Sequence, residues 1–91
     1  MISVVVPIYN SVDTITDCIK SILQQSFRDF EIILVDDGCT DRSGLLCDVF
    51  SEKYDCITVV HQQNKGRVEA RKIGVEKAIG EWIFQTYDSK G

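Results

Sequence analysis

Four short apolar runs, each separated from the next by an amphipathic stretch, constrain the fold of this chain more than any other feature. Three of them, residues 2–6, 30–35 and 57–60, are rich in Val and Ile, and the fourth runs from Trp82 to Thr86. Runs of this length and composition are typical of strands buried on both faces of a parallel sheet. The strand–helix alternation therefore predicts an α/β fold, in which a mainly parallel sheet of about four strands has helices along it.

The stretches between these runs predict three helices. Pro7 is expected to end the first strand, and Asn10 or Ser11 then caps a first helix. A second helix is expected over residues 43–54, and a third over residues 67–79 with Gly80 at its C-terminal cap. The apolar positions expected to face the core include Val12, Ile15, Cys18, Ile19, Ile22, Leu23, Leu45, Leu46, Val49 and Phe50, and Trp82 is expected to pack the sheet against a helix.

A Rossmann-like strand order, 3-2-1-4, would gather several polar side chains at one edge of the sheet. Ligands of open α/β sheets bind beyond the carboxyl ends of the strands where the order reverses, here between the first and fourth strands. The residues that arrive there are an aromatic one, Tyr9, and three acidic ones, Asp36, Asp37 and Asp88. The sequence therefore predicts a polar ligand site at this edge.

The motifs that are missing narrow the kind of ligand. Neither GxGxxG nor GxxxxGK[ST] occurs, so a dinucleotide site and a P-loop ATP site are disfavoured. A flat ring can instead stack on a base, and carboxylates can accept hydrogen bonds from a base or ribose or bind a divalent cation. The net charge of −4 and the lack of a polybasic run argue against nucleic-acid binding.

The four cysteines are expected to be reduced thiols. Their spacings contain no CxxC pair, which disfavours a zinc site, and no secretory signal precedes them. Reduced cysteines are typical of cytosolic proteins. The longest apolar runs are also much shorter than the ~20 residues of a transmembrane helix.

Several motifs, in order, resemble family 2 glycosyltransferases of the GT-A fold, and the resemblance covers essentially the whole chain. The motifs are Val-Pro-Ile-Tyr-Asn at 6–10, the blocks 21–27 and 30–41, and Asn-Lys-Gly at 64–66 followed by Ala70, Arg71, Gly74, Ala78, Gly80 and Glu81. Cys39 stands where the family usually has Ser. The resemblance implies that residues 1–91 form the donor-binding part of a transferase domain, truncated before the acceptor-binding half.

The resemblance also implies roles for individual residues. It implies a nucleotide-diphosphate sugar as donor substrate, bound at Pro7 and Tyr9, with the base stacked near Tyr9. An acid of the pair Asp36 and Asp37, preferably Asp37, would hydrogen-bond the base, and Arg71 would lie near the phosphates. As alternatives, Arg71 could form an ion pair on the helix surface, and His61 is expected to be structural. No catalytic base can be named from the sequence.

The metal-binding motif of the family is altered in this chain. The family places Asp-x-Asp near the end of the fourth strand to bind Mg²⁺ or Mn²⁺ through the donor diphosphate. In one register its acids fall on Tyr87 and Ser89, and in the other Asp88 is kept while Lys90 replaces the second acid. Asp88 is thus the single candidate metal ligand.

The expected activity is an inverting sugar transfer to an acceptor hydroxyl, in the synthesis of a glycan or cell-envelope polysaccharide. The expected location is the cytoplasm or the inner face of the membrane. The 91 residues alone are expected to bind nucleotide without turnover, and to self-associate through an apolar edge beside the fourth strand. The alternatives are a non-catalytic, degenerate transferase module and a phosphoacceptor receiver domain.

Overall fold

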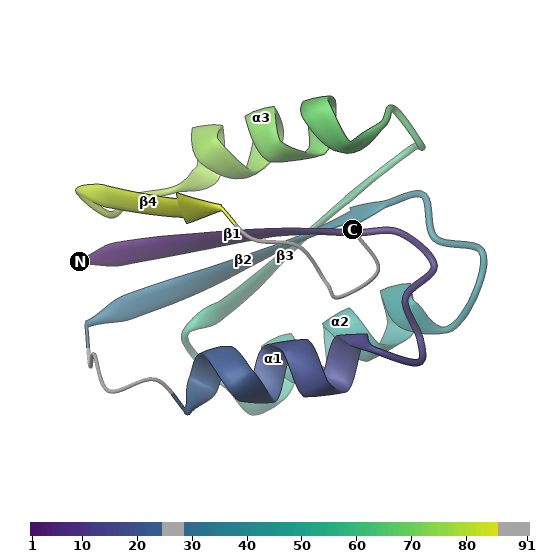
Figure 1. The fold of residues 1–91 in the computed structure, drawn as a ribbon, viewed down its shortest axis with the longest axis horizontal. Coiled ribbons are helices and arrows are strands. Elements are labelled where there is room, and N and C mark those ends of the chain that lie inside the picture. The colour runs from purple at the N-terminus through teal and green to yellow at the C-terminus, as the bar shows by residue number, and fades with distance from the viewer. Residues whose placement is uncertain (25–28, 86–91) are drawn as a thin grey trace.

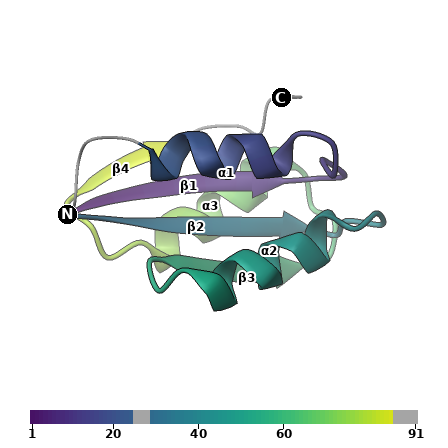
Figure 2. The same cartoon turned by 90° about the horizontal axis from the view of Figure 1, so that it is seen from below.

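A four-stranded parallel sheet forms the middle layer of the structure, with helices on both of its faces (Figures 1 and 2). The computed structural model describes residues 1–24 and 29–85. The strands are β1 (Ile2–Ile8), β2 (Phe30–Asp37), β3 (Ile57–Gln62) and β4 (Trp82–Gln85). The helices α1 (Ile15–Leu23) and α2 (Ser43–Lys53) lie on one side of the sheet, and α3 (Arg67–Lys77) lies on the other.

The strand order is β3-β2-β1-β4, and all three pairings are parallel. This confirms the predicted α/β class and the predicted order. It also separates the chain from receiver domains, whose flavodoxin-like order 2-1-3-4-5 places β3 beside β1. The phosphoacceptor alternative is therefore dropped.

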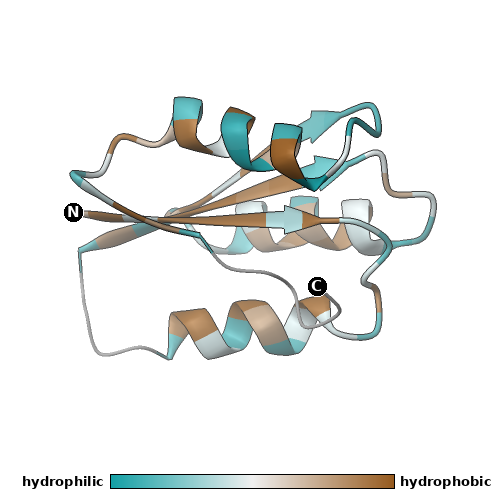
Figure 3. Ribbon diagram, turned by 45° about the horizontal axis from the view of Figure 1, so that its top comes forward, coloured by the Kyte–Doolittle hydropathy of each residue, from teal (hydrophilic) through white to brown (hydrophobic). Residues whose placement is uncertain are grey.

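Each face of the sheet has its own apolar core, and both cores are filled from alternate positions along the strands. The larger core lies under α1 and α2, and its buried members include Val4, Val6, Ile8, Ile15, Ile19, Ile32, Leu34, Cys47, Phe50 and Ile57. The smaller core lies under α3 and consists of Val5, Ile33, Val35 and Ala70. Figure 3 shows this apolar character running along the inner strands.

β1 continues through Pro7 to Ile8, so the prediction that Pro7 ends the strand is wrong. The N–H of Ile2 bonds to Asp29 on the β2 side, whereas the carbonyl of Met1 accepts bonds on the β4 side. Alternate residues of a strand bond to the same neighbour, so the backbone nitrogen of Pro7, which carries no hydrogen, faces the β4 side. The described pairing with β4 ends before this position, at Val5. Proline is tolerated there because no described ladder bond is lost.

The first helix begins later than predicted. Its N-cap is Thr14, without a side-chain capping bond, rather than Asn10 or Ser11. The carbonyl of Ser11 accepts the N–H groups of Thr14 and Ile15, so a turn precedes the helix. Val12 lies in this turn and is exposed.

Two other groups of apolar residues lie outside the core, contrary to expectation. Leu45 and Val49 are 68% and 55% exposed, because α2 presents Cys47 and Phe50 to the sheet instead. Trp82 on β4 is 71% exposed, because the helices pack mainly on other strands. α3 packs on β1 and β2, and α2 packs on β2 and β3. Self-association through the exposed strand β4 stays a prediction.

Gly80 serves a close approach rather than a helix cap. The C-cap of α3 is Ala78, in an extended conformation. A Cβ on Gly80 would lie 2.5 Å from the hydroxyl oxygen of Ser3, to which the Gly80 N–H donates. The same hydroxyl donates to Glu31, whose carboxylate also accepts the N–H of Ile79. These bonds fasten the segment before β4 to β1 and β2.

Candidate functional site

The carboxyl ends of β1, β2 and β3 bring most of the predicted site residues to one edge of the sheet. In the strand register, Ile8 pairs with Asp36, and Asp36 pairs with His61. Tyr9 follows directly after the β1 pairing, and the residue is 50% exposed. The register therefore brings Tyr9 to the same edge of the sheet as the two aspartates. Asp88, the predicted metal ligand, lies outside the described residues.

Asp36 and Asp37 point to opposite faces of the sheet. Along β2, Ile32 and Leu34 belong to the core under α1 and α2, whereas Ile33 and Val35 belong to the core under α3. The same alternation sends Asp36 to the α1 and α2 side and Asp37 to the α3 side. The two acids therefore have different neighbours, although they are adjacent in sequence.

Asp37 binds the loop that leads into α3. Its Oδ1 accepts hydrogen bonds from Gln62 Nε2 and from the N–H of Lys65, both at 2.8 Å, and its Oδ2 accepts the N–H of Gly66 at 3.1 Å. Gly66 is the N-cap of α3, which has no side-chain cap of its own. The carboxylate, only 4% exposed as a residue, thus satisfies donors near the start of this helix from a neighbouring strand.

Asp36 is held by a different set of groups. Its Oδ1 accepts the N–H of Cys39 at 2.9 Å, and its Oδ2 lies 2.6 Å from Nδ1 of His61. The other ring nitrogen of His61 lies 2.8 Å from Oδ1 of Asp48 on α2. Burial opposes ionisation of Asp36, but the hydrogen bonds from Cys39 and His61 outweigh it and hold the pKa of this carboxyl below its ordinary value. The bonds to Asp36 and then Asp48 raise the pKa of His61, against a smaller opposing effect of burial.

The loop after β1 and the loop after β2 are joined by a set of hydrogen bonds around Asn10. Asn10 has a left-handed backbone, with φ of 47°, which Asn tolerates better than most residues. Its side-chain oxygen accepts the N–H groups of Thr40 at 2.8 Å and Asp41 at 3.3 Å, and its amide donates to the Thr40 hydroxyl. The N–H of Val12 donates to Asp41 as well. These bonds fix the backbone next to Tyr9.

Sequence reasoning assigned no role to Asn10, Cys39 or Gln62 in shaping the site. Asn10 and Cys39 lie within the quoted motifs, but their partners are 29 to 31 residues away in sequence. Cys39 also carries a thiol whose pKa burial and the neighbouring Asp36 raise to about 11, so that it is protonated at neutral pH. Gln62 could have been found by the register, since it follows His61 at the end of β3.

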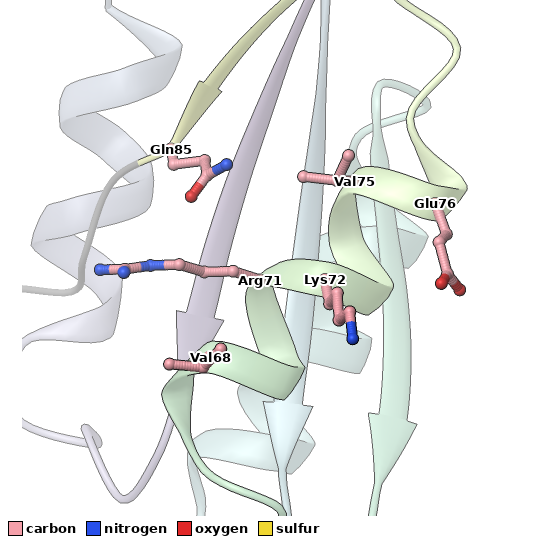
Figure 4. A pocket seen from close by; sticks show the side chains of 6 residues that line it. All are labelled: Val68, Arg71, Lys72, Val75, Glu76 and Gln85. Atoms are coloured by element: carbon pink, nitrogen blue, oxygen red, sulfur yellow. The ribbon is translucent and has the colours of Figure 1, made fainter.

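Arg71 lines a cavity of about 380 Å³ between α3 and β4, together with Val68, Lys72, Val75, Glu76 and Gln85 (Figure 4). Figure 4 shows its side chain extending from α3 toward the side where Gln85 lies, whereas Lys72 and Glu76 point away from it. Arg71 is on the same side of the sheet as Asp37. The cavity therefore has a guanidinium and apolar side chains in its lining, on the same side of the sheet as Asp37.

Within residues 1–24 and 29–85, no three His, Cys, Asp or Glu side chains come together as a metal site. The four cysteines are free thiols. In the same described ranges, every helix is too short or too polar to cross a bilayer.

We expect the stability of the chain to be greatest in mildly acidic solution because of Asp36 and His61. The folded-state pKa of Asp36 is lowered, so its contribution is present above about pH 4 and is lost as the pH falls through the folded value. The folded-state pKa of His61 is raised, so its contribution is complete below about pH 6.5 and is lost as the pH rises through the folded value. Since the His61 side chain is 49% exposed, screening limits its contribution to about 1 kcal/mol or less.

Urea denaturation at a series of pH values tests this expectation. The decline above neutral pH should be smaller in His61→Gln than in the natural chain, because Gln does not titrate. An identical decline in both proteins would show that other groups cause it.

The sequence model described as Glycosyl transferase family 2 matches residues 3–86 of this chain. Among curated relatives, the chain is 48% identical over 84 residues to "Glycosyltransferase GlyG" of Streptococcus pneumoniae, covering 91% of this chain and 28% of the relative. It is 42% identical over 83 residues to the glycosyltransferase EpsJ of Bacillus subtilis, covering 91% of this chain and 24% of that protein. The chain thus spans only about a quarter of the length of these relatives.

Solved structures give a similar result. The structure of S. aureus TarS 1-349 in complex with UDP-GlcNAc superposes with a TM-score of 0.86 at 30% identity, covering 96% of this chain and 26% of that one. The mannosyltransferase PcManGT of Pyrobaculum calidifontis, in complex with GDP-Man and Mn²⁺, superposes with a TM-score of 0.89 at 24% identity, covering 96% and 27%. Because the identity to PcManGT is only 24%, this similarity shows the fold alone.

Proposed function

This chain belongs to glycosyl transferase family 2, and from that premise we propose that it binds the nucleotide of a sugar donor at the carboxyl edge of its sheet. It would supply the donor-binding part of an enzyme that transfers the sugar from a nucleotide diphosphate to an acceptor hydroxyl. The TarS structure, which is similar over 96% of this chain, contains UDP-GlcNAc and supports a donor of this class.

The observation that carries the proposal is the set of hydrogen bonds on the buried carboxylate of Asp37, at the edge of the sheet where the chain continues from β1 into Tyr9. A carboxylate has about four acceptor positions, and three of those on Asp37 are used by Gln62, Lys65 and Gly66. The remaining position is on Oδ2. A base that stacks on Tyr9 could donate its ring N–H to this oxygen.

This arrangement favours uracil or guanine over adenine or cytosine. Uracil and guanine carry a ring N–H on their pairing edge, whereas adenine and cytosine present an unprotonated ring nitrogen there. If the unprotonated ring nitrogen of adenine or cytosine faced the carboxylate of Asp37, neither acceptor would gain a hydrogen bond, and binding would lose about 1–3 kcal/mol. Asp37 would therefore select a base that carries a ring N–H donor.

The phosphates would extend from the base toward Arg71. This side chain lies on the α3 side of the sheet, as Asp37 does, and lines the cavity beside β4. A guanidinium can bind phosphate oxygens in pairs, and it would balance part of the diphosphate charge. Pro7 would contribute by fixing the backbone that carries Tyr9.

The chemistry of transfer requires residues beyond those identified here. A carboxylate base would deprotonate the acceptor hydroxyl for in-line attack on the anomeric carbon, with inversion. A divalent cation, if held by Asp88, would stabilise the leaving diphosphate. An inverting outcome, a role in polysaccharide synthesis and a cytoplasmic location all rest on the family resemblance.

Isothermal titration with UDP, GDP, ADP and CDP, each with and without Mn²⁺, tests the proposal. We expect UDP or GDP to bind with a Kd on the order of 0.1–1 mM, ADP and CDP to bind at least about tenfold more weakly, and no sugar transfer. Binding that needs no Mn²⁺ would indicate that the altered motif has lost its ion. The absence of binding by all four nucleotides would favour the non-catalytic module.

A further inference from the structure

His61 on β3 is connected to the loop that carries Tyr9, although it lies on the opposite side of the sheet from Asp37. Its Nδ1 lies 2.6 Å from Oδ2 of Asp36, and Oδ1 of Asp36 accepts the N–H of Cys39 at 2.9 Å. Both distances, from His61 to Asp36 and from Asp36 to Cys39, are within hydrogen-bond range. A change at His61 can therefore reach Cys39 through a single carboxylate.

Cys39 in turn contacts the backbone on both sides of Tyr9. Its thiol donates to the carbonyl oxygen of Ile8 at 3.5 Å, and its sulfur accepts the N–H of Asn10 at 3.4 Å. Ile8 and Asn10 are the chain neighbours of Tyr9. The position of Cys39 therefore helps to set the position of the exposed ring between them.

The distances at His61 favour the protonated form of its ring. Both ring nitrogens face carboxylate oxygens, Nδ1 that of Asp36 at 2.6 Å and Nε2 that of Asp48 at 2.8 Å. A neutral imidazole has one N–H and can donate to only one of them, whereas an imidazolium donates to both. Loss of the proton thus turns one of these contacts into a repulsion between acceptors.

We propose that His61 is a positioning residue for the nucleotide site, which acts through Asp36 and Cys39 on the loop around Tyr9 and holds that loop best when it is protonated. This inference rests on the proposed function, because it assigns Tyr9 to the base. His61 itself would not touch the nucleotide.

The groups around His61 support this role. Two acidic groups face the ring of His61, Asp36 from β2 and Asp48 from α2. The hydrogen bonds to these carboxylates raise the pKa of His61. Gly44 of α2 leaves room for the carboxylate of Asp36, since a Cβ at that position would lie 2.7 Å from Oδ2 of Asp36.

The first test follows the connection without any nucleotide. Amide resonances of Cys39 and Asn10 are recorded by NMR from about pH 5.5 to pH 8.5, together with the imidazole signals of His61. We expect both amides to shift with the midpoint of His61, and the shift to disappear in His61→Gln. Asp48→Asn should lower that midpoint, because it removes one of the two charges that favour the imidazolium.

The second test measures binding. The probe is UDP-GlcNAc or GDP-mannose, whichever binds the natural chain, because the diphosphate of such a sugar has no group that titrates in this range. We expect affinity to be about fivefold higher at pH 6 than at pH 8.5, and to be independent of pH in His61→Gln. Glu52→Gln, which removes an exposed acid one turn beyond Asp48, is the matched control and should keep the pH dependence.

The outcomes separate the two proposals. Binding that is equally tight at both pH values would overturn the role of His61 and leave the nucleotide site intact. Amides of Cys39 and Asn10 that do not follow His61 would overturn the connection itself. If no nucleotide binds at any pH, the proposed function and the positioning role both fail, even where the amides still follow His61.

Discussion

Asp37→Asn is expected to lower the affinity for UDP or GDP roughly thirty- to hundredfold, which corresponds to about 2–3 kcal/mol. Asn keeps the size of the side chain but replaces one acceptor oxygen with a donor NH₂ group. At the Oδ2 position that group would face both the base N–H and the N–H of Gly66, and at the Oδ1 position it would face the N–H of Lys65 and the amide of Gln62. Isothermal titration of the variant with the nucleotide that binds the natural chain measures the loss.

Asp36→Asn is the matched control for this substitution. Asp36 is adjacent to Asp37 and similarly buried, at 8% exposed against 4%, but it faces the other side of the sheet. Its replacement should destabilise the fold by a similar amount while affinity falls by no more than about fivefold. Equal losses of affinity in the two variants would contradict the assignment of Asp37 to the base.

Gly74→Ala is expected to destabilise the fold by about 2 kcal/mol or more, although Ala normally stabilises a helix relative to Gly by about 1 kcal/mol. A Cβ on Gly74 would lie 2.2 Å from Cγ1 of Val5 and 3.3 Å from Cγ2 of Val35. Both valines are buried in the core under α3, so neither has space to move. Urea denaturation of the variant measures the free energy of unfolding.

A double-mutant cycle with Val5→Ala identifies the cause of the loss. Val5→Ala alone should cost about 2 kcal/mol because it leaves a cavity. In the double variant the new methyl group occupies part of that space, so the combined loss should be smaller than the sum by at least about 1 kcal/mol. Strict additivity, or a single variant Gly74→Ala that is more stable than the natural chain, would contradict the proposed contact.

The fold could be predicted from the sequence because its two central strands are buried. The β-branched runs of β1 and β2 mark strands covered on both faces, and the strand–helix alternation leaves few possible topologies. The element ends were less predictable. Pro7 is tolerated inside β1 because its nitrogen faces β4 beyond the described pairing. The sequence of β1 alone does not show this, since it depends on the position of the neighbouring strand.

The sequence could predict which candidate residues share an edge of the sheet, because this follows from the strand order. The contacts of these residues do not, because they join segments 25 to 31 positions apart, as in the pairs His61 with Asp36 and Asn10 with Thr40. The exposure of Trp82 was also missed, since a single sequence does not show which strand lies at the edge of the helical layers.

The opposite directions of Asp36 and Asp37 have a consequence for how such a chain can be altered by mutation. Asp36 shares contacts with His61 on one side of the sheet, and Asp37 shares contacts with Gln62 on the other. We therefore expect substitutions at positions 36 and 61 to depend on each other, and substitutions at positions 37 and 62 to do the same. If both proposals hold, exchange of the first pair would change how binding responds to acidity, and exchange of the second would change the choice of base.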